Sequence, residues 1–213
     1  MIIQRDAYSY NHSPCACSIT NRQTGSVLRH PTRSRLVVAT PPLEDPNFDR
    51  TVVYMIEHSE EGAIGVVLNR PLTDDLEAPL DRWTPHLADP AVLHDGGPVD
   101  PDAMIALARP TPATPDEVDG ALKIADGVWS VDLSGDPALI APSFAGVRVF
   151  RGYAGWGAGQ LDAEIDAGAW IVTDAMTDDV FGRRPQDLWR AVLSRQPGRL
   201  AWLAQAPDDL SLN

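Results

Sequence analysis

The residues of this chain best suited to chemistry are polar and aromatic side chains at the ends of strand-like runs and beside glycine-rich corners. They are His58, Asn69, Arg70, Arg151, Tyr153, Trp156 and Gln160. Because binding sites often gather on loops held by a rigid scaffold, we expect these side chains to line one concave surface. Such a surface would bind a protein partner or a small ligand, which predicts a non-enzymatic regulatory module. The alternative is a hydrolase of unknown substrate that uses His58 or a nearby acid as its base.

The stretch 151–164 is the most unusual part of the sequence, because glycines are interleaved there with Tyr153 and Trp156. It follows an apolar run and precedes a helical pattern, as the phosphate-binding loop of a dinucleotide-binding protein does. However, Gln160 and Asp162 stand where the two possible patterns need their third glycine, and acids crowd the following helix, where a pyrophosphate would bind. We therefore predict no nucleotide cofactor. A tight strand-to-helix corner packed by the two aromatic side chains is favoured over direct ligand contact.

Support for other catalytic chemistry is thin. The sequence has no Gly-x-Ser-x-Gly elbow, so His58 and His94 are candidate bases without an evident nucleophile. A histidine at a strand end is more often a structural residue. The acids at such corners are Asp45, Glu57, Asp95, Asp162 and Glu164. Their separation in space does not follow from the sequence, so paired-carboxylate chemistry stays open.

Metal binding has equally little support. His12, Cys15, Cys17 and His30 supply ligand types, but their spacing matches no recognised zinc site. We predict no metal and no other cofactor. With only two cysteines, both near the start of the chain, the fold is not expected to depend on disulfides.

The charge is unevenly distributed along the chain. The net charge is −13, yet residues 1–35 hold five arginines and one aspartate, whereas residues 36–213 hold 12 basic and 29 acidic residues. So acidic a body repels phosphate backbones, and we do not expect the core to bind nucleic acid directly. Residues 185–204 resemble a helix-turn-helix in spacing, but the second stretch is apolar where a DNA-reading helix needs polar side chains.

The composition indicates a cytoplasmic protein. No apolar stretch is long enough to span a bilayer, and the first residues contain no apolar region typical of a secretory signal. We therefore expect no membrane partner and a cytoplasmic location.

Strand-like runs dominate the part of the sequence that must position these residues. They cover 36–39, 51–58, 63–69, 91–94, 103–107, 128–133 and 169–173. The short connection through Gly62 predicts a hairpin between the second and third runs. We predict helices at 75–83, over the residues before Gly168 and from Pro185 onward. Short helical turns are expected at 137–140 and 200–203, and an exposed loop at 109–127. Early strands in hairpins and late helices indicate an α+β fold rather than a regular βαβ alternation.

The organised pattern begins only at Leu36. We predict that residues 1–35 form a disordered or loosely attached tail and that residues 36–213 form a single domain. A related hypothesis is that translation starts at Val27 or Leu28 from an alternative start codon.

Several motifs resemble, in order, those of the AlgH/YqgE family of bacterial proteins. Ala39-Thr-Pro-Pro-Leu-Glu-Asp45-Pro46-Asn-Phe48 is followed by Gly62-Ala-Ile-Gly65-Val-Val-Leu-Asn69-Arg-Pro71 and Gly96-Gly97-Pro98. Gly152-Tyr153-Ala-Gly155-Trp156-Gly-Ala-Gly159-Gln160-Leu161 carries the most distinctive match, followed by Trp170 and Leu188-Trp189. The resemblance extends from about Leu36 to the C-terminus.

This resemblance implies a single α+β domain whose mainly antiparallel strands curl into a barrel-like sheet with helices packed outside. The family carries the label of a transcriptional regulator. The resemblance implies no activity, cofactor or catalytic residue that could be carried over to this chain.

Overall fold

The computed structural model describes residues 29–41, 43, 45–182 and 184–205. The strands are β1 (Arg35–Ala39), β2 (Val52–Ser59), β3 (Gly62–Val67), β4 (His94–Asp95), β5 (Val99–Pro110), β6 (Ala121–Ala125), β7 (Val128–Val131), β8 (Phe144–Gly157) and β9 (Trp170–Asp174). The α-helices are α1 (Pro137–Ile140), α2 (Gln160–Asp166), α3 (Thr177–Phe181), α4 (Leu188–Ser194) and α5 (Leu200–Leu203). Three 3-10 helices are η1 (Leu80–His86), η2 (Ala141–Ser143) and η3 (Pro185–Asp187).

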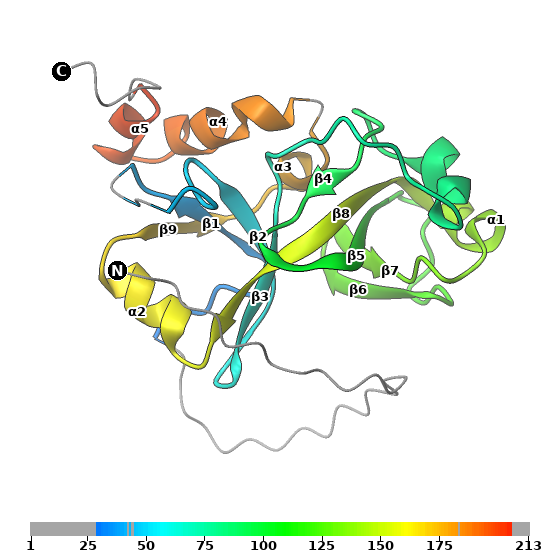
Figure 1. Ribbon diagram of the computed structural model, residues 1–213, viewed down its shortest axis with the longest axis horizontal. Helices are drawn as coiled ribbons and strands as arrows, with labels where there is room; N and C mark the ends of the chain where they lie inside the picture. Colours follow the sequence, from blue (N-terminus) through cyan, green and yellow to red (C-terminus); the bar gives the residue numbers. More distant parts are fainter. Residues whose placement is uncertain (1–28, 42, 44, 183, 206–213) are drawn as a thin grey trace.

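One curled sheet organises the molecule (Figure 1). Its strand order is β6-β7-β5-β8-β3-β2-β1-β9, and neighbouring strands on this path are antiparallel. The short strand β4 lies off the path and pairs with β8 in parallel. The 14-residue β8 joins the two halves of the sheet, because it pairs with β5 along its first part and with β3 along its last. The predicted α+β fold with a barrel-like sheet is therefore confirmed.

Both faces of the sheet are covered, which explains the continuous apolar runs in its central strands. In β1, Leu36 and Val38 face the concave side of the sheet, whereas Val37 and Ala39 face the convex side. The concave side is filled by an inner core to which strands of both halves contribute, together with Val180, Trp189 and Val192 of α3 and α4. These two helices close one end of the half-barrel (Figure 1).

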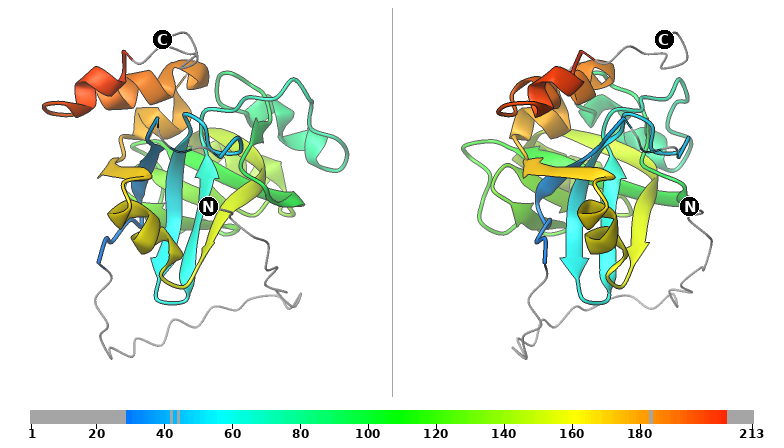
Figure 2. Two further views of the ribbon diagram at one scale, coloured as in Figure 1. Left: turned by 60° about the vertical axis from the view of Figure 1, so that its left-hand side comes forward. Right: turned by 90° about the vertical axis from the view of Figure 1, so that its left-hand side faces the viewer.

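Two further clusters lie on the convex side. One, around the fully buried Trp83, packs η1 and α1 against β5, β7 and β8. The other packs Leu161 of α2 against β1, β2, β3 and the end of β8. Figure 2 shows α2 lying across the outer face of this half of the sheet.

The two ends of the curled sheet meet at a seam. Ser34, just before β1, donates a hydrogen bond to the carbonyl oxygen of Ile124 in β6 over 3.5 Å. The turn after β6 lies against α3, since a Cβ on Gly127 would overlap the hydroxyl of Thr177. An ion pair between Arg109 of β5 and Asp178 of α3, 2.8 Å long, spans the same region. These contacts leave the half-barrel closed by side chains rather than by a continuous strand ladder.

Several local predictions need correction. The glycine-rich stretch does not begin as a loop, because β8 continues to Gly157 and its last residues pair with Gly62–Gly65 of β3. The predicted loop 109–127 contains a strand. The prolines of this segment end at Pro115, and β6, which follows them, pairs with β7. The run at 91–94 supplies only the first residue of β4, and the helix predicted at 75–83 is the 3-10 helix Leu80–His86.

The other predicted elements agree with the structure. The hairpin of β2 and β3, the helices after Gly159 and Pro185 and the short turns α1 and α5 are present where the sequence indicates them. Within the described part of the chain, no helix is long and apolar enough to cross a membrane.

Candidate functional site

Glu164 of α2 is the centre of the hydrogen-bond network that ends β8. Its Oε2 accepts the indole N–H groups of Trp156, at 2.9 Å, and Trp170, at 2.8 Å. Its Oε1 accepts the amide of Gln160 at 2.9 Å, and the carbonyl oxygen of that amide accepts the backbone N–H of Gly157 at 3.0 Å. The end of β8, the first turns of α2 and the start of β9 are thereby fixed to one carboxylate.

Aromatic rings complete this corner. Phe48 stacks against Trp156 with 6.1 Å between ring centroids and meets the edge of Trp170 at 5.4 Å. The two indoles contact each other edge-to-face at 5.7 Å. All three rings are buried. Because offset and edge-to-face arrangements stabilise aromatic clusters, Trp156 acts as a packing residue, in agreement with the favoured interpretation of the glycine-rich stretch.

His58 is buried at the end of β2. Its Nδ1 lies 2.9 Å from the hydroxyl of Thr32, and Thr32 itself is fully buried. The hydroxyl is within reach of the base that a hydrolase would need, but a substrate would have to displace the segment that carries Thr32. His58 is thus the one candidate base beside a potential nucleophile.

The segment that contains Thr32 is held against α2. The backbone N–H of His30 donates to Asp162 at 3.2 Å, and the ring of His30 lies 2.8 Å from Asp166. Arg29 contacts the same Asp166 at 3.1 Å, and hydrogen bonds from His30 and Arg29 lower the pKa of this carboxyl. Residues 29–35, the described part of the predicted tail, thus contact the domain. Residues 1–28, with His12, Cys15 and Cys17, lie outside the described residues, and so do both predicted alternative start positions.

Asn69 and Arg70 follow β3 and make local contacts. The side chain of Asn69 accepts the N–H of Val52 at 2.9 Å and donates to the carbonyl of Arg50 at 2.8 Å, so that it clips the start of β2 to the end of β3. Arg70 donates to the carbonyl of Pro46 at 3.2 Å. Both side chains therefore hold the segment between β1 and β2.

Arg151 and Tyr153 extend from β8 in a third environment. Arg151 forms an exposed ion pair with Asp74 at 3.1 Å. Tyr153 packs against the inner core, whereas Trp156 belongs to the cluster on the convex side. The seven candidate residues thus lie on both faces of the sheet, and the prediction that they share one concave surface was wrong. Trp156 and Gln160 share a bonding partner, Glu164. Partner binding by any of the seven remains a prediction.

His94 and Arg148 are buried polar residues on the concave side. His94 of β4 is fully buried, its Nδ1 contacts the carbonyl of Val92 at 3.2 Å, and its Nε2 has no partner among the described residues. Burial, reinforced by repulsion from Arg148, lowers the pKa of His94 to about 4. The ring is therefore neutral at pH 7, and its enclosure leaves it without access to a substrate.

Arg148 is a buried residue that holds parts of the fold together, and the sequence did not reveal it as one. It is 1% exposed and donates to the carbonyls of Val180 at 2.7 Å, Asp89 at 2.8 Å and Gly182 at 3.1 Å. Two of these carbonyls end α3, where helix carbonyls lack internal partners and carry partial negative charge. Burial lowers the pKa of Arg148 to about 10, which leaves it charged at neutral pH. The alternation that places Phe150 inward also points Arg148 inward, and this was the available signal.

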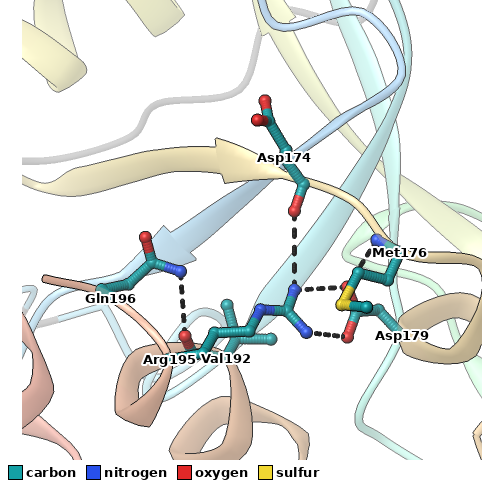
Figure 3. Close-up of polar contacts among 6 residues, drawn as sticks. All are labelled: Asp174, Met176, Asp179, Val192, Arg195 and Gln196. Carbon is teal, nitrogen blue, oxygen red and sulfur yellow. Dashed lines mark hydrogen bonds and ion pairs between the residues drawn. The ribbon is translucent and has the colours of Figure 1, made fainter.

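A partly buried ion pair joins α3 to the residue that ends α4 (Figure 3). Both terminal nitrogens of Arg195 contact Asp179, at 2.7 and 2.5 Å, and Asp179 is 6% exposed. Asp179 also accepts the backbone N–H of Met176 at 2.7 Å at the start of α3.

An open cleft of about 410 Å³ lies between α3 and η3–α4, with Arg184 and Asp187 among its lining residues. The described residues contain no group of three ligating side chains placed to hold a metal ion.

The exposed surface contains a few large apolar side chains. They are Met104, Leu122, Leu139, Met176 and Trp202. Leu122 is 67% exposed and differs from the others in its position, because it lies on β6, the strand at one end of the sheet. The sequence interpretation missed this feature because it took the strand for part of a loop.

The comparisons with known proteins agree on one family. The profile of the AlgH-like family (DUF179) matches residues 36–201. A UPF0301 protein from Streptomyces coelicolor is 45% identical over 181 residues, which cover 84% of this chain and 94% of that protein. A UPF0301 protein from Thermobifida fusca is 48% identical over 186 residues, covering 84% and 93% of the two chains.

Two solved structures share the fold. A crystal structure of protein DIP2367 from Corynebacterium diphtheriae has a TM-score of 0.78 and 31% identity, covering 84% of this chain and 94% of that one. A solution structure of the AlgH protein from Pseudomonas aeruginosa has a TM-score of 0.59 and 29% identity, covering 87% and 99%.

Proposed function

The chain belongs to the AlgH-like family, and on that premise we propose that it is a non-enzymatic cytoplasmic module that binds a protein partner with regulatory consequences. The observation that carries the proposal is Leu122, which is 67% exposed on β6, a strand that pairs with β7 alone in the part of the chain that the structure describes. Exposed apolar residues on an open sheet edge favour strand addition by another chain.

The inward contacts of the conspicuous polar residues support a binding rather than a catalytic role. Glu164, Asn69 and the buried Arg148 form hydrogen bonds with other groups of the same domain. His94 is fully enclosed. A rigid scaffold of this kind presents its surface without rearrangement, which lowers the entropic cost of association.

Site-directed photocrosslinking tests the proposal. A photoreactive phenylalanine analogue replaces Leu122 in the full chain, which is expressed in its bacterial host and irradiated. The matched control carries the analogue at Trp202, which is 74% exposed on α5, at the opposite end of the molecule from β6 (Figure 1). We expect a discrete crosslinked protein from position 122 and none from position 202. Equal crosslinking from both positions, or none from position 122, would contradict the proposal.

The alternative function is a hydrolase that uses His58. The 2.9 Å contact between its Nδ1 and the Thr32 hydroxyl favours it, because a nucleophile and a base must be within hydrogen-bond reach. The full burial of Thr32 opposes it. Turnover of a simple activated ester that disappears equally in Thr32→Val and His58→Gln, with folding preserved, would support this alternative over the binding module.

A further inference from the structure

At Lys123, one residue before the contact between Ile124 and Ser34, the backbone of β6 has no second partner strand among the described residues. Ala121 lies opposite Val131, which places Gly120 opposite Asp132, and the N–H of Asp132 donates to Gly120 over 2.8 Å. In an antiparallel pair, residues that bond to the partner strand alternate with residues whose N–H and C=O point away. Lys123, one residue beyond the next bonded position, therefore points its backbone groups away from β7. Among the described residues, β6 has β7 as its only neighbouring strand.

β6 carries one strongly exposed apolar side chain, and the segments next to β6 and β7 in the sequence are rich in acids. Leu122 supplies the exposed apolar contact. Five exposed acids flank β6 and β7 in the sequence, namely Asp116, Glu117, Asp119, Asp126 and Asp132. Lys123 is the only lysine of the chain, and it forms a 2.7 Å ion pair with Asp126. The other four acids form no ion pair with this lysine.

The negative charge of this part of the molecule favours some binding partners at the edge of β6 over others. Residues 36–182 carry 26 acidic and seven basic side chains, so nucleic acid and acidic segments are repelled by the whole sheet. A second copy of the chain that paired β6 with β6 would bring two such acidic groups together. A basic segment instead gains from the surrounding carboxylates, and an extended one also satisfies the backbone of Lys123.

We propose that β6 is the docking edge for an extended basic segment of a protein partner, which adds to the sheet as a strand beside Lys123. This inference rests on the proposed binding function and names its surface and partner chemistry. Successive side chains of the added strand alternate between the two faces of the sheet. An apolar residue would therefore cover Leu122, while basic residues on the other face approach Asp116, whose charge acts on Lys123.

Fluorescence anisotropy with a synthetic peptide tests the inference. The probe is a fluorescein-labelled ten-residue peptide of alternating lysine and valine, and its control alternates glutamate and valine. We expect the full-length protein to bind the lysine peptide and to ignore the glutamate peptide. Binding should weaken at higher salt, because exposed charge pairs are screened. Absence of lysine-peptide binding at millimolar concentration, or equal binding of both peptides, would overturn the inference.

Two variants of Lys123 separate strand addition from charge attraction. Lys123→Pro removes the outward N–H, and proline is tolerated on an edge strand whose N–H faces solvent. Lys123→Gln removes the same charge but keeps the N–H. We expect at least ten-fold weaker peptide binding by the proline variant and unchanged or tighter binding by the glutamine variant. Undiminished binding by a folded Lys123→Pro protein would overturn strand addition.

The result also separates this inference from the proposed function. If position 122 crosslinks to a protein in cells but the lysine peptide does not bind, the binding function stands and the basic strand is wrong. Concentration-dependent dimers that Lys123→Pro abolishes, measured by analytical ultracentrifugation, would make a second copy the occupant and would likewise overturn the inference.

Discussion

The indole N–H of Trp156, at the end of β8, donates a 2.9 Å hydrogen bond to the carboxylate of Glu164 on α2. The same oxygen accepts the indole of Trp170, so a single acid satisfies two buried aromatic donors. This contact converts the glycine-rich stretch into a packing corner, because it fixes strand, helix and the following strand at one point.

Replacing Glu164 by alanine should therefore destabilise the fold. Two buried indole N–H groups would lose their acceptor, and each unsatisfied buried donor costs roughly 1–3 kcal/mol. We expect a loss of about 2–5 kcal/mol in the free energy of unfolding, measured by urea denaturation. The matched control is Asp166→Ala on the same helix, whose exposed carboxylate contacts Arg29 and His30 at the surface. Equal denaturation midpoints for the two variants would contradict the assigned role of Glu164.

The sequence was sufficient for the fold class and for the hairpin of β2 and β3, because these depend on local patterns. Alternation and a glycine-containing turn identify the hairpin without reference to the rest of the chain. The apolar run of β1 likewise indicates a strand buried on both faces. β6 was not predicted, because prolines precede it and its sequence, with exposed residues such as Leu122, shows no alternation of apolar and polar side chains.

The candidate site could not be assembled from sequence, because its contacts join distant residues. Glu164 and Trp156 are close in sequence, but the bonds of Arg148 to Asp89 and Val180 span 59 and 32 positions. Tyr153 and Trp156 lie on one strand near one glycine cluster, yet they face different cores. Polar residues at strand ends thus proved to be the groups that fasten the segments between strands, as Asn69 does.

Arg148→Met tests the structural role of the buried guanidinium. The methionine fills similar space but removes the hydrogen bonds that Arg148 donates to three carbonyl oxygens, two of them at the end of α3. A buried acceptor that loses its donor costs about 1–3 kcal/mol, and we expect these losses to total about 3–5 kcal/mol in chemical denaturation. Arg109→Met is the control, because Arg109 pairs with Asp178 at the surface and should cost less than about 1 kcal/mol. A stable Arg148→Met protein would show that the packed volume, rather than these bonds, matters.

His94 should make the stability of the fold pH-dependent. Its pKa is about 4 in the folded protein and about 6.5 when unfolded, so the unfolded chain binds more protons between these values. The contribution of His94 to stability is thus fully present above about pH 6.5 and is lost as the pH falls toward 4. The loss reaches on the order of 3 kcal/mol. We expect the unfolding free energy of His94→Gln to vary less steeply over this range than that of the unchanged protein.

The partly exposed His86 supplies the control for this pH series. The matched variant is His86→Gln, which removes a histidine that is not enclosed and leaves His94 in place. If all three proteins show the same slope between pH 4 and 6.5, the titration of His94 does not contribute, and surface carboxylates account for the acid sensitivity.

Gly97 and Gly159 should respond differently to the same substitution. Both have a positive φ, of +141° and +69°, but a Cβ on Gly97 would overlap the backbone of Tyr153 in β8, whereas a Cβ on Gly159 meets nothing within 4 Å. Gly159→Ala should therefore cost only the backbone strain, about 1 kcal/mol. Gly97→Ala must also push β8 away from the β4 corner, and we expect a loss above about 3 kcal/mol or failure to fold, measured by thermal denaturation. A Gly97→Ala protein as stable as Gly159→Ala would mean that the corner relaxes and that the close approach of the two backbones is not required.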